Sequence, residues 1–179
     1  RCPFGGECFV ERSRESARTA DLIVTNHALV AINAMHGGTA LPEHDALIID
    51  EAHELMGRLT TAATGELSAG VAERVVKRCL AWLDDELGGD LLDAVEELHD
   101  ALADSPTGRI TGVDVPLPVA CAGLRDASRR AISDLGKDRD NPERSQAAGA
   151  LGEIFDISER IARLADQDVV WVSRSDGIG

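Results

Sequence analysis

Two adjacent carboxylates and a nearby imidazole follow directly on an apolar run in ALIIDEAHEL, residues 46–55. Mg²⁺ takes one or two protein carboxylates and keeps most of its water, so Asp50 fits a residue that holds this metal. Glu51 could then orient a water molecule or take its proton as the water attacks a phosphate. His53 could hydrogen-bond to a second domain and report whether nucleotide is bound. The pattern predicts the metal-and-water half of a nucleotide-hydrolysing site, with Asp50, Glu51 and His53 as its catalytic residues.

The two acids also have a structural interpretation, because carboxylates in the first turn of a helix complement the helix dipole. That interpretation leaves His53 unexplained, and a four-residue string in its strand-then-helix context is fairly specific. The phosphate-binding half of such a site is absent. A P-loop needs G-x-x-x-x-G-K-[ST], whereas the one Gly-Lys pair, Gly136-Lys137, precedes Asp138 within a helical region. We therefore expect this chain to hydrolyse no ATP by itself.

The four cysteines are of two kinds. Cys2 and Cys8 lie in a Gly- and Pro-containing loop that could fold around a metal or cluster, although their spacing alone is weak support. Cys79 and Cys121 lie on helical apolar stripes, where an isolated cysteine is usually a small core residue. No disulfide framework of a secreted protein is apparent, which favours a reducing cytoplasm.

The first third of the chain has the pattern of alternating strands and helices. A short buried strand is expected at residues 23–24, and Asn26 can cap the helix that follows it. Residues 36–38, His-Gly-Gly, stop that helix. A second buried strand is expected at residues 47–49, with a helix beginning at Asp50 or Glu51. Two strands do not make a parallel sheet on their own, so further strands are needed to complete one.

From residue 57 onward the apolar spacing is helical. We expect helices over residues 67–87, ended by Gly88-Gly89, over 90–103, around 120–135, and from Asn141-Pro142 to about 165, with a connector at 105–118 and a strand in DVVWVS at 168–173. The predicted fold class is mainly α-helical α+β. It consists of part of an α/β domain, in the order strand–helix–strand–helix, followed by a helical domain. The family resemblance given below implies that the α/β part belongs to a P-loop-type motor domain.

Charge limits the partners of the chain, whose formal net charge is −14. Residues 84–104 contain nine acidic side chains and neither Lys nor Arg, which is typical of a solvated helix face. Positive charge gathers at Arg12, Arg14 and Arg18 and again at Arg125, Arg129 and Arg130. As a whole the chain would repel nucleic acid, so any contact with DNA needs local basic patches. No apolar run approaches the roughly 18 residues of a membrane span.

Three segments together resemble a known family: CPFGGECF at residues 2–9, ADLIVTNHALV at 20–30 and LPEHDALIIDEAHEL at 41–55. In order and spacing they are similar to the iron–sulfur helicases of superfamily two, the DinG- and XPD-type enzymes, and more to the bacterial DinG branch. The close resemblance covers residues 1 to about 56. The helical remainder occupies the place of that family's arch domain, and its sequence is much less diagnostic.

The resemblance implies an ATP-dependent 5′-to-3′ DNA helicase that uses ATP and Mg²⁺ and acts on single-stranded or forked DNA. It implies that Cys2 and Cys8 are two of four ligands of a 4Fe–4S cluster, and that Asn26 and His27 lie near the ATPase core and the DNA path. The chain, which opens at Arg1, would be an interior part of such an enzyme. Residues 1–18 would be half of the cluster loop, 19–56 part of the first motor domain, and 57–179 an arch-like domain.

A second interpretation belongs to another class of protein. The chain could be a non-catalytic helical interaction module in which the Asp-Glu-Ala-His sequence is a relic or a coincidence. A P-loop and two further cysteines in the full reading frame would favour the helicase.

Overall fold

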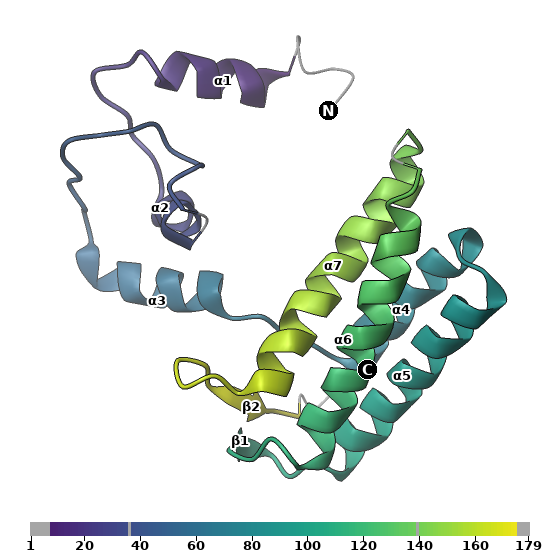
Figure 1. The fold of residues 1–179 in the computed structure, drawn as a ribbon. Helices are drawn as coiled ribbons and strands as arrows, with labels where there is room; N and C mark the ends of the chain where they lie inside the picture. Colours follow the sequence, from purple (N-terminus) through teal and green to yellow (C-terminus); the bar gives the residue numbers. More distant parts are fainter. Residues whose placement is uncertain (1–7, 36, 139, 175–179) are drawn as a thin grey trace, which may run out of the picture. The chain divides into compact units, whose positions relative to one another are not determined.

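A computed structural model of the chain describes residues 8–35, 37–138 and 140–174. The chain divides into two compact units, one ending at Gly65 and the other beginning at Glu66 (Figure 1). Each unit is described by itself below.

The described residues of the first unit form three helices, α1 (Phe9–Ala17), α2 (His27–Met35) and α3 (Ala52–Ala63). Helices α2 and α3 contact each other. The Asn26 side chain caps α2 as predicted, since its Oδ1 accepts a hydrogen bond from the Leu29 N–H at 2.9 Å. Gly37 and Gly38 follow with φ of 66° and 78°, a region that favours glycine. The predicted stop of α2 is confirmed at these glycines, while His36 lies outside the described residues.

The strands predicted at residues 23–24 and 47–49 are wrong for the described chain, where both segments are irregular. Val24 is 90% exposed and Ile48 is 94% exposed. A strand obtains its backbone hydrogen bonds only from a neighbouring strand, and neither segment pairs with another part of the described chain. Of the predicted strand–helix–strand–helix order, only the two helices, α2 and α3, are present in the described chain. Helix α3 begins at Ala52, close to its predicted start.

The second unit is a bundle of four helices: α4 (Ala69–Cys79), α5 (Asp85–Asp104), α6 (Pro116–Leu135) and α7 (Pro142–Arg163). Helix α4 contacts α5 and α7, and α6 contacts the same two helices, so the four form a closed ring. Figure 1 shows α6 and α7 side by side, joined by a short turn. The largest fully buried side chains are leucines from three of the helices, Leu91, Leu98, Leu124, Leu135 and Leu151.

The prediction of one helix over residues 67–87, ended by Gly88-Gly89, is wrong. Helix α4 ends at Cys79 and is followed by the 3₁₀ turn η1 (Leu80–Trp82). Asp84 then caps α5, because its Oδ1 accepts from the Leu87 N–H at 2.8 Å. Gly88 lies inside α5, where a Cβ would come within 3.0 Å of Leu80 Cδ2. That glycine serves close packing rather than helix termination.

A two-stranded antiparallel ribbon completes this unit, formed by β1 (Gly108–Ile110) and β2 (Val170–Val172). Arg109 is opposite Trp171, and Ile110 and Val172 are buried. The strand predicted in DVVWVS is confirmed. Its partner β1 falls within residues 105–118, which were expected to be only a connector. Within the described residues no helix is both long and apolar enough to cross a membrane.

Arg144 joins the start of α7 to the end of α6. Asn141 caps α7 by accepting hydrogen bonds from the N–H groups of Glu143 and Arg144 at 3.0 and 3.1 Å. The Arg144 guanidinium donates to the carbonyls of Leu135 at 2.9 Å and Asp134 at 2.7 Å. The last carbonyls of a helix lack partners inside the helix, so this side chain supplies donors where α6 needs them.

We predict that Arg144→Met destabilises the chain by about 1–2 kcal/mol, because it keeps the aliphatic stem but removes the donors to two carbonyls. Chemical denaturation monitored by circular dichroism measures this. Arg163→Met is the matched control: Arg163 is 72% exposed and forms an i,i+4 pair with Glu159, whereas Arg144 is 17% exposed. We expect the control to cost at most about 0.5 kcal/mol. Equal losses in the two variants would remove the capping role from Arg144.

Cys79 and Cys121 are fully buried, which confirms that both are core residues. Burial raises the pKa of the Cys79 thiol from its ordinary 9.0 to about 11, and that of the Cys121 thiol to about 12. The thiolate is the reactive and metal-binding form of cysteine, so both groups are inert at neutral pH.

We expect a thiol reagent at pH 8 to modify Cys79 and Cys121 only after the chain is unfolded, while Cys8, which is only partly buried, reacts in the native chain. Because the folded pKa values lie above the unfolded value, both thiols stabilise the fold below about pH 9. That stabilisation is lost as the pH rises through about 11 to 12. Mass spectrometry of the labelled cysteines and alkaline unfolding curves test the two parts. Fast labelling of Cys121 in the native chain would contradict the burial argument.

Candidate functional site

The turn before α3 carries the two predicted catalytic carboxylates, Asp50 and Glu51. Glu51 has φ 47° and ψ 45°, a left-handed conformation that is uncommon for a residue with a side chain. The Asp50 carboxylate accepts a hydrogen bond from the Glu51 N–H at 2.9 Å, and the Glu51 carbonyl accepts one from the Glu54 N–H at 2.9 Å. The turn is thus closed by short local bonds, and it exposes both carboxylates to solvent.

His27, the first residue of α2, reaches this turn from a distant part of the sequence. Its Nε2 lies 2.8 Å from the backbone carbonyl oxygen of Asp50. Since a carbonyl oxygen only accepts hydrogen bonds, Nε2 carries the hydrogen. Nothing in the spacing of the two motifs indicated this bond. The only signal was that both motifs belong to the pattern that resembles one family.

His53 lies beside the second carboxylate of the turn. Its Nδ1 is 3.3 Å from Glu51 Oε2, and the two side chains are 76% and 66% exposed. An exposed pair of this kind adds little stability. It can still set the direction of the Glu51 carboxylate.

The structure therefore gathers the predicted residues Asn26, His27, Asp50, Glu51 and His53 around the starts of α2 and α3. Asp50 and Glu51 form no ion pair with Lys or Arg among the described residues. No group of three or more potential metal ligands occurs in that part of the chain. A hard cation that keeps most of its water fits such a site, whereas a metal that needs an all-protein cage does not.

Gly136-Lys137 is not a phosphate loop. Gly136 is the residue that follows α6, and the Lys137 ammonium lies 2.5 Å from the Asp134 carboxylate. This pair ends a helix and belongs to the second unit, whereas α2 and α3 belong to the first.

Of the two predicted cluster ligands, Cys8 directly precedes α1 and is partly buried, while Cys2 lies outside the described residues. The positive end of a helix dipole favours negative charge, so a thiolate ligand is compatible with the position of Cys8. Cys79 and Cys121 are enclosed in the bundle core, so they are not available as further ligands of a cluster.

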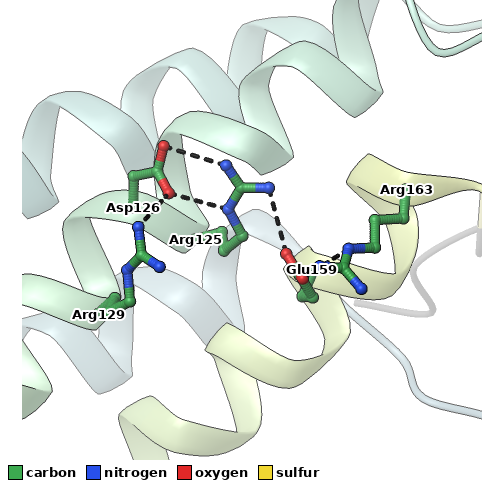
Figure 2. A network of polar contacts seen from close by, with 5 residues as sticks. All are labelled: Arg125, Asp126, Arg129, Glu159 and Arg163. Carbon is green, nitrogen blue, oxygen red and sulfur yellow. Dashed lines mark hydrogen bonds and ion pairs between the residues drawn. The ribbon is translucent and has the colours of Figure 1, made fainter.

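The arginines that could form a basic patch on the bundle are mostly paired with carboxylates. Figure 2 shows a chain of contacts between α6 and α7 in which Arg125 bonds both oxygens of Asp126, at 2.9 and 3.1 Å, and Glu159, at 3.1 Å. The hydrogen bond from Arg125 lowers the pKa of the Asp126 carboxyl. Arg129 extends this series of contacts by pairing with Asp126, and Arg163 extends it by pairing with Glu159.

The other clustered arginines show the same behaviour. Arg130 lies 2.8 Å from Asp90. Arg14 in α1 and Arg18 directly after it pair with acids three residues before them. The positive clusters seen in the sequence are thus largely neutralised. The sequence could not show this, because Asp90 and Glu159 approach α6 only in the folded bundle.

Comparison with known proteins gives relatives of one kind. The chain is 43% identical over 114 residues to "ATP-dependent helicase DinG" of Mycobacterium tuberculosis, which covers 64% of this chain and 17% of the relative. It is 40% identical over 58 residues to "ATP-dependent DNA helicase YoaA" of Escherichia coli, covering 30% of this chain and 9% of the relative. It is 27% identical to "ATP-dependent DNA helicase DinG" of Photobacterium profundum, covering 95% of this chain and 29% of the relative.

No protein-family model matches the chain, and no solved structure matches it. The chain spans about a sixth of the length of the mycobacterial relatives. Within that span, the relatives' shared name confirms the resemblance that the motifs indicated: this chain is similar to part of the DinG-type ATP-dependent helicases.

Proposed function

We propose that the protein containing this chain is an ATP-dependent DNA helicase of DinG type, with the Asp50–Glu51 turn as part of its ATPase site. The observation that carries the proposal is the 43% identity to a helicase of that name. The geometry supports it, because two exposed carboxylates stand side by side in a turn that is fixed on two sides. We further propose that ATP hydrolysis drives movement along single-stranded DNA with 5′-to-3′ polarity.

In the proposed reaction, Asp50 would hold Mg²⁺, directly or through water, and Glu51 would take a proton from the attacking water. The water oxygen forms a bond to the γ-phosphorus, and the bond from that phosphorus to the β–γ bridging oxygen breaks. ADP and inorganic phosphate are the products. Mg²⁺, when bound, neutralises charge on the phosphate oxygens. His53 is proposed to direct the Glu51 carboxylate toward that water, and the 3.3 Å distance from its Nδ1 to Glu51 Oε2 supports this role.

The phosphate-binding part of the site comes, in this proposal, from regions of the protein beyond this chain. The relatives are several times longer than the chain, which leaves room for a P-loop and a second motor domain. Residues 19–56 are then a part of the first motor domain and residues 57–179 an arch-like domain. The chain by itself is proposed to be inactive.

The iron–sulfur cluster is the second cofactor of the proposal, with Cys2 and Cys8 as two of its four ligands. Soft thiolates are the usual ligands of such clusters. The place of Cys8 before α1 is compatible with this role, and the burial of Cys79 and Cys121 removes them as competitors.

Single-stranded or forked DNA is the proposed substrate, with Asn26 and His27 near its path. A DNA-facing role of the bundle rests on the resemblance alone. The pairing of its arginines favours the second candidate for the bundle, a helical module that binds protein partners and makes little contact with DNA.

We predict that Glu51→Gln in the full-length protein retains nucleotide binding but lowers DNA-stimulated ATP turnover by about 10²- to 10⁴-fold, since an amide cannot take a proton from water. Asp50→Asn should instead weaken Mg²⁺-dependent nucleotide binding, because a charged ligand is lost. Phosphate release and binding of a fluorescent nucleotide separate the two effects. Glu54→Gln, in the first turn of α3, is the matched control and should turn over normally. Wild-type turnover by the Glu51 variant would exclude the proposed chemistry.

We predict that Cys8→Ser in the full-length protein bleaches the visible absorbance of the cluster and lowers the iron content, because one of four thiolates is lost. Cys79→Ala and Cys121→Ala are the controls and should leave both readings unchanged. Iron analysis and absorbance spectra of anaerobically purified protein provide the test. Full iron content in the Cys8 variant would return this segment to an ordinary structural loop.

A further inference from the structure

We infer that His27 is a positioning residue for the catalytic turn, which it holds by a hydrogen bond from its ring to the backbone of Asp50. This inference rests on the proposed ATPase role of Asp50 and Glu51. The distance from His27 Nε2 to the Asp50 carbonyl oxygen is 2.8 Å, across 23 residues of sequence. The bond therefore fixes the start of α2 against the turn that precedes α3.

The peptide unit between Asp50 and Glu51 is held at both of its polar ends. Its carbonyl oxygen accepts from His27. Its N–H donates to the Asp50 carboxylate at 2.9 Å. A peptide unit is planar, so its orientation sets ψ of the residue before it and φ of the residue after it together. Holding this plane fixes the backbone on both sides, where the two catalytic side chains are attached.

The backbone of Glu51 needs such a restraint. Its φ of 47° and ψ of 45° are in the left-handed region, which is unfavourable for a residue with a side chain. A flip of the plane would let Glu51 return to a negative φ and would turn its carboxylate in another direction. Losing the bond from His27 removes one of the two contacts that oppose this flip.

His27 is itself well fixed. It is the first residue of α2, directly after the cap made by Asn26, whose Oδ1 accepts from the Leu29 N–H. One turn further along, Ala31 is fully buried, and α2 contacts α3. The ring therefore extends from a fixed backbone. The Asn26-His27 pair of the sequence thus has a physical function: one residue begins the helix and the next one restrains the turn.

The chemistry of the bond makes the inference testable by substitution. A glutamine amide can place an N–H near the position of the histidine Nε2, whereas an asparagine is too short and an alanine has no donor. We expect His27→Gln in the full-length protein to keep kcat for DNA-stimulated ATP hydrolysis within about threefold of wild type. His27→Asn and His27→Ala should lower kcat by on the order of ten- to a hundredfold with little change in KM for ATP.

His44 is the matched control, because its ring also contacts a carbonyl, that of Pro42 at 2.9 Å, but lies outside the site. His44→Ala should turn over ATP normally. Wild-type kcat in His27→Ala would overturn the inference, as would a loss in His27→Gln as large as that in His27→Ala.

A measurement on the unmutated chain does not depend on activity or on the folding of a variant. Nitrogen-15 NMR of histidine-labelled chain should show His27 with a hydrogen on Nε2. A ring protonated only at Nδ1 would overturn the inference. Normal turnover by Glu51→Gln would instead refute the proposed function and leave the His27 bond standing as a structural contact. The two failures are thus distinguishable.

Discussion

The backbone of a strand finds hydrogen-bond partners only in a neighbouring strand, whereas a helix supplies its own, and this requirement separates the two units of the chain. In the second unit every long element is a helix, and the one strand with a strong sequence signal, β2, finds β1 beside it. In the first unit the apolar segments before α2 and α3 find no such neighbour in the described chain. They remain irregular, with Leu22, Val24 and Ile48 exposed.

The consequence for the candidate site is that its turn depends on a side chain. In a complete parallel sheet, neighbouring strands would hold the residues before Asp50. Here one imidazole and one carboxylate hold a single peptide unit. A contiguous exposed apolar patch often marks a surface that another part of the protein or a partner covers. Under the proposed function, the sheet of the motor domain covers Val24 and Ile48. That sheet would hold the segment before Asp50, and the bond from His27 would further restrain the turn itself.

Local sequence signals were sufficient to predict the ends of several helices. They were insufficient to predict contacts between residues that are distant in the sequence. Asn26 and Asn141 cap the helices they were expected to begin, since a cap acts within a few residues. Gly88 was wrongly predicted to end a helix. A glycine is needed there because Leu80 packs closely against it in the folded chain. Strand β1 was missed because three residues with a glycine and an arginine carry no apolar alternation. The residue types of the candidate site were predictable, but the bond that joins its two motifs was not.

The bundle shows how the same limit applies to charge. The arginines of α6 look like a binding patch in the sequence, yet in the fold they bridge to acids on α5 and α7. The positive charge of these arginines is neutralised by carboxylates of the bundle itself. The excess negative charge of α5 therefore remains at the surface. At physiological ionic strength this charge acts over roughly 8 Å, about the width of one side-chain layer. A DNA strand could therefore pass the bundle at a modest distance without strong repulsion, but little attraction would hold it there. Under the proposed function, we therefore expect the main contacts with DNA to lie outside the bundle.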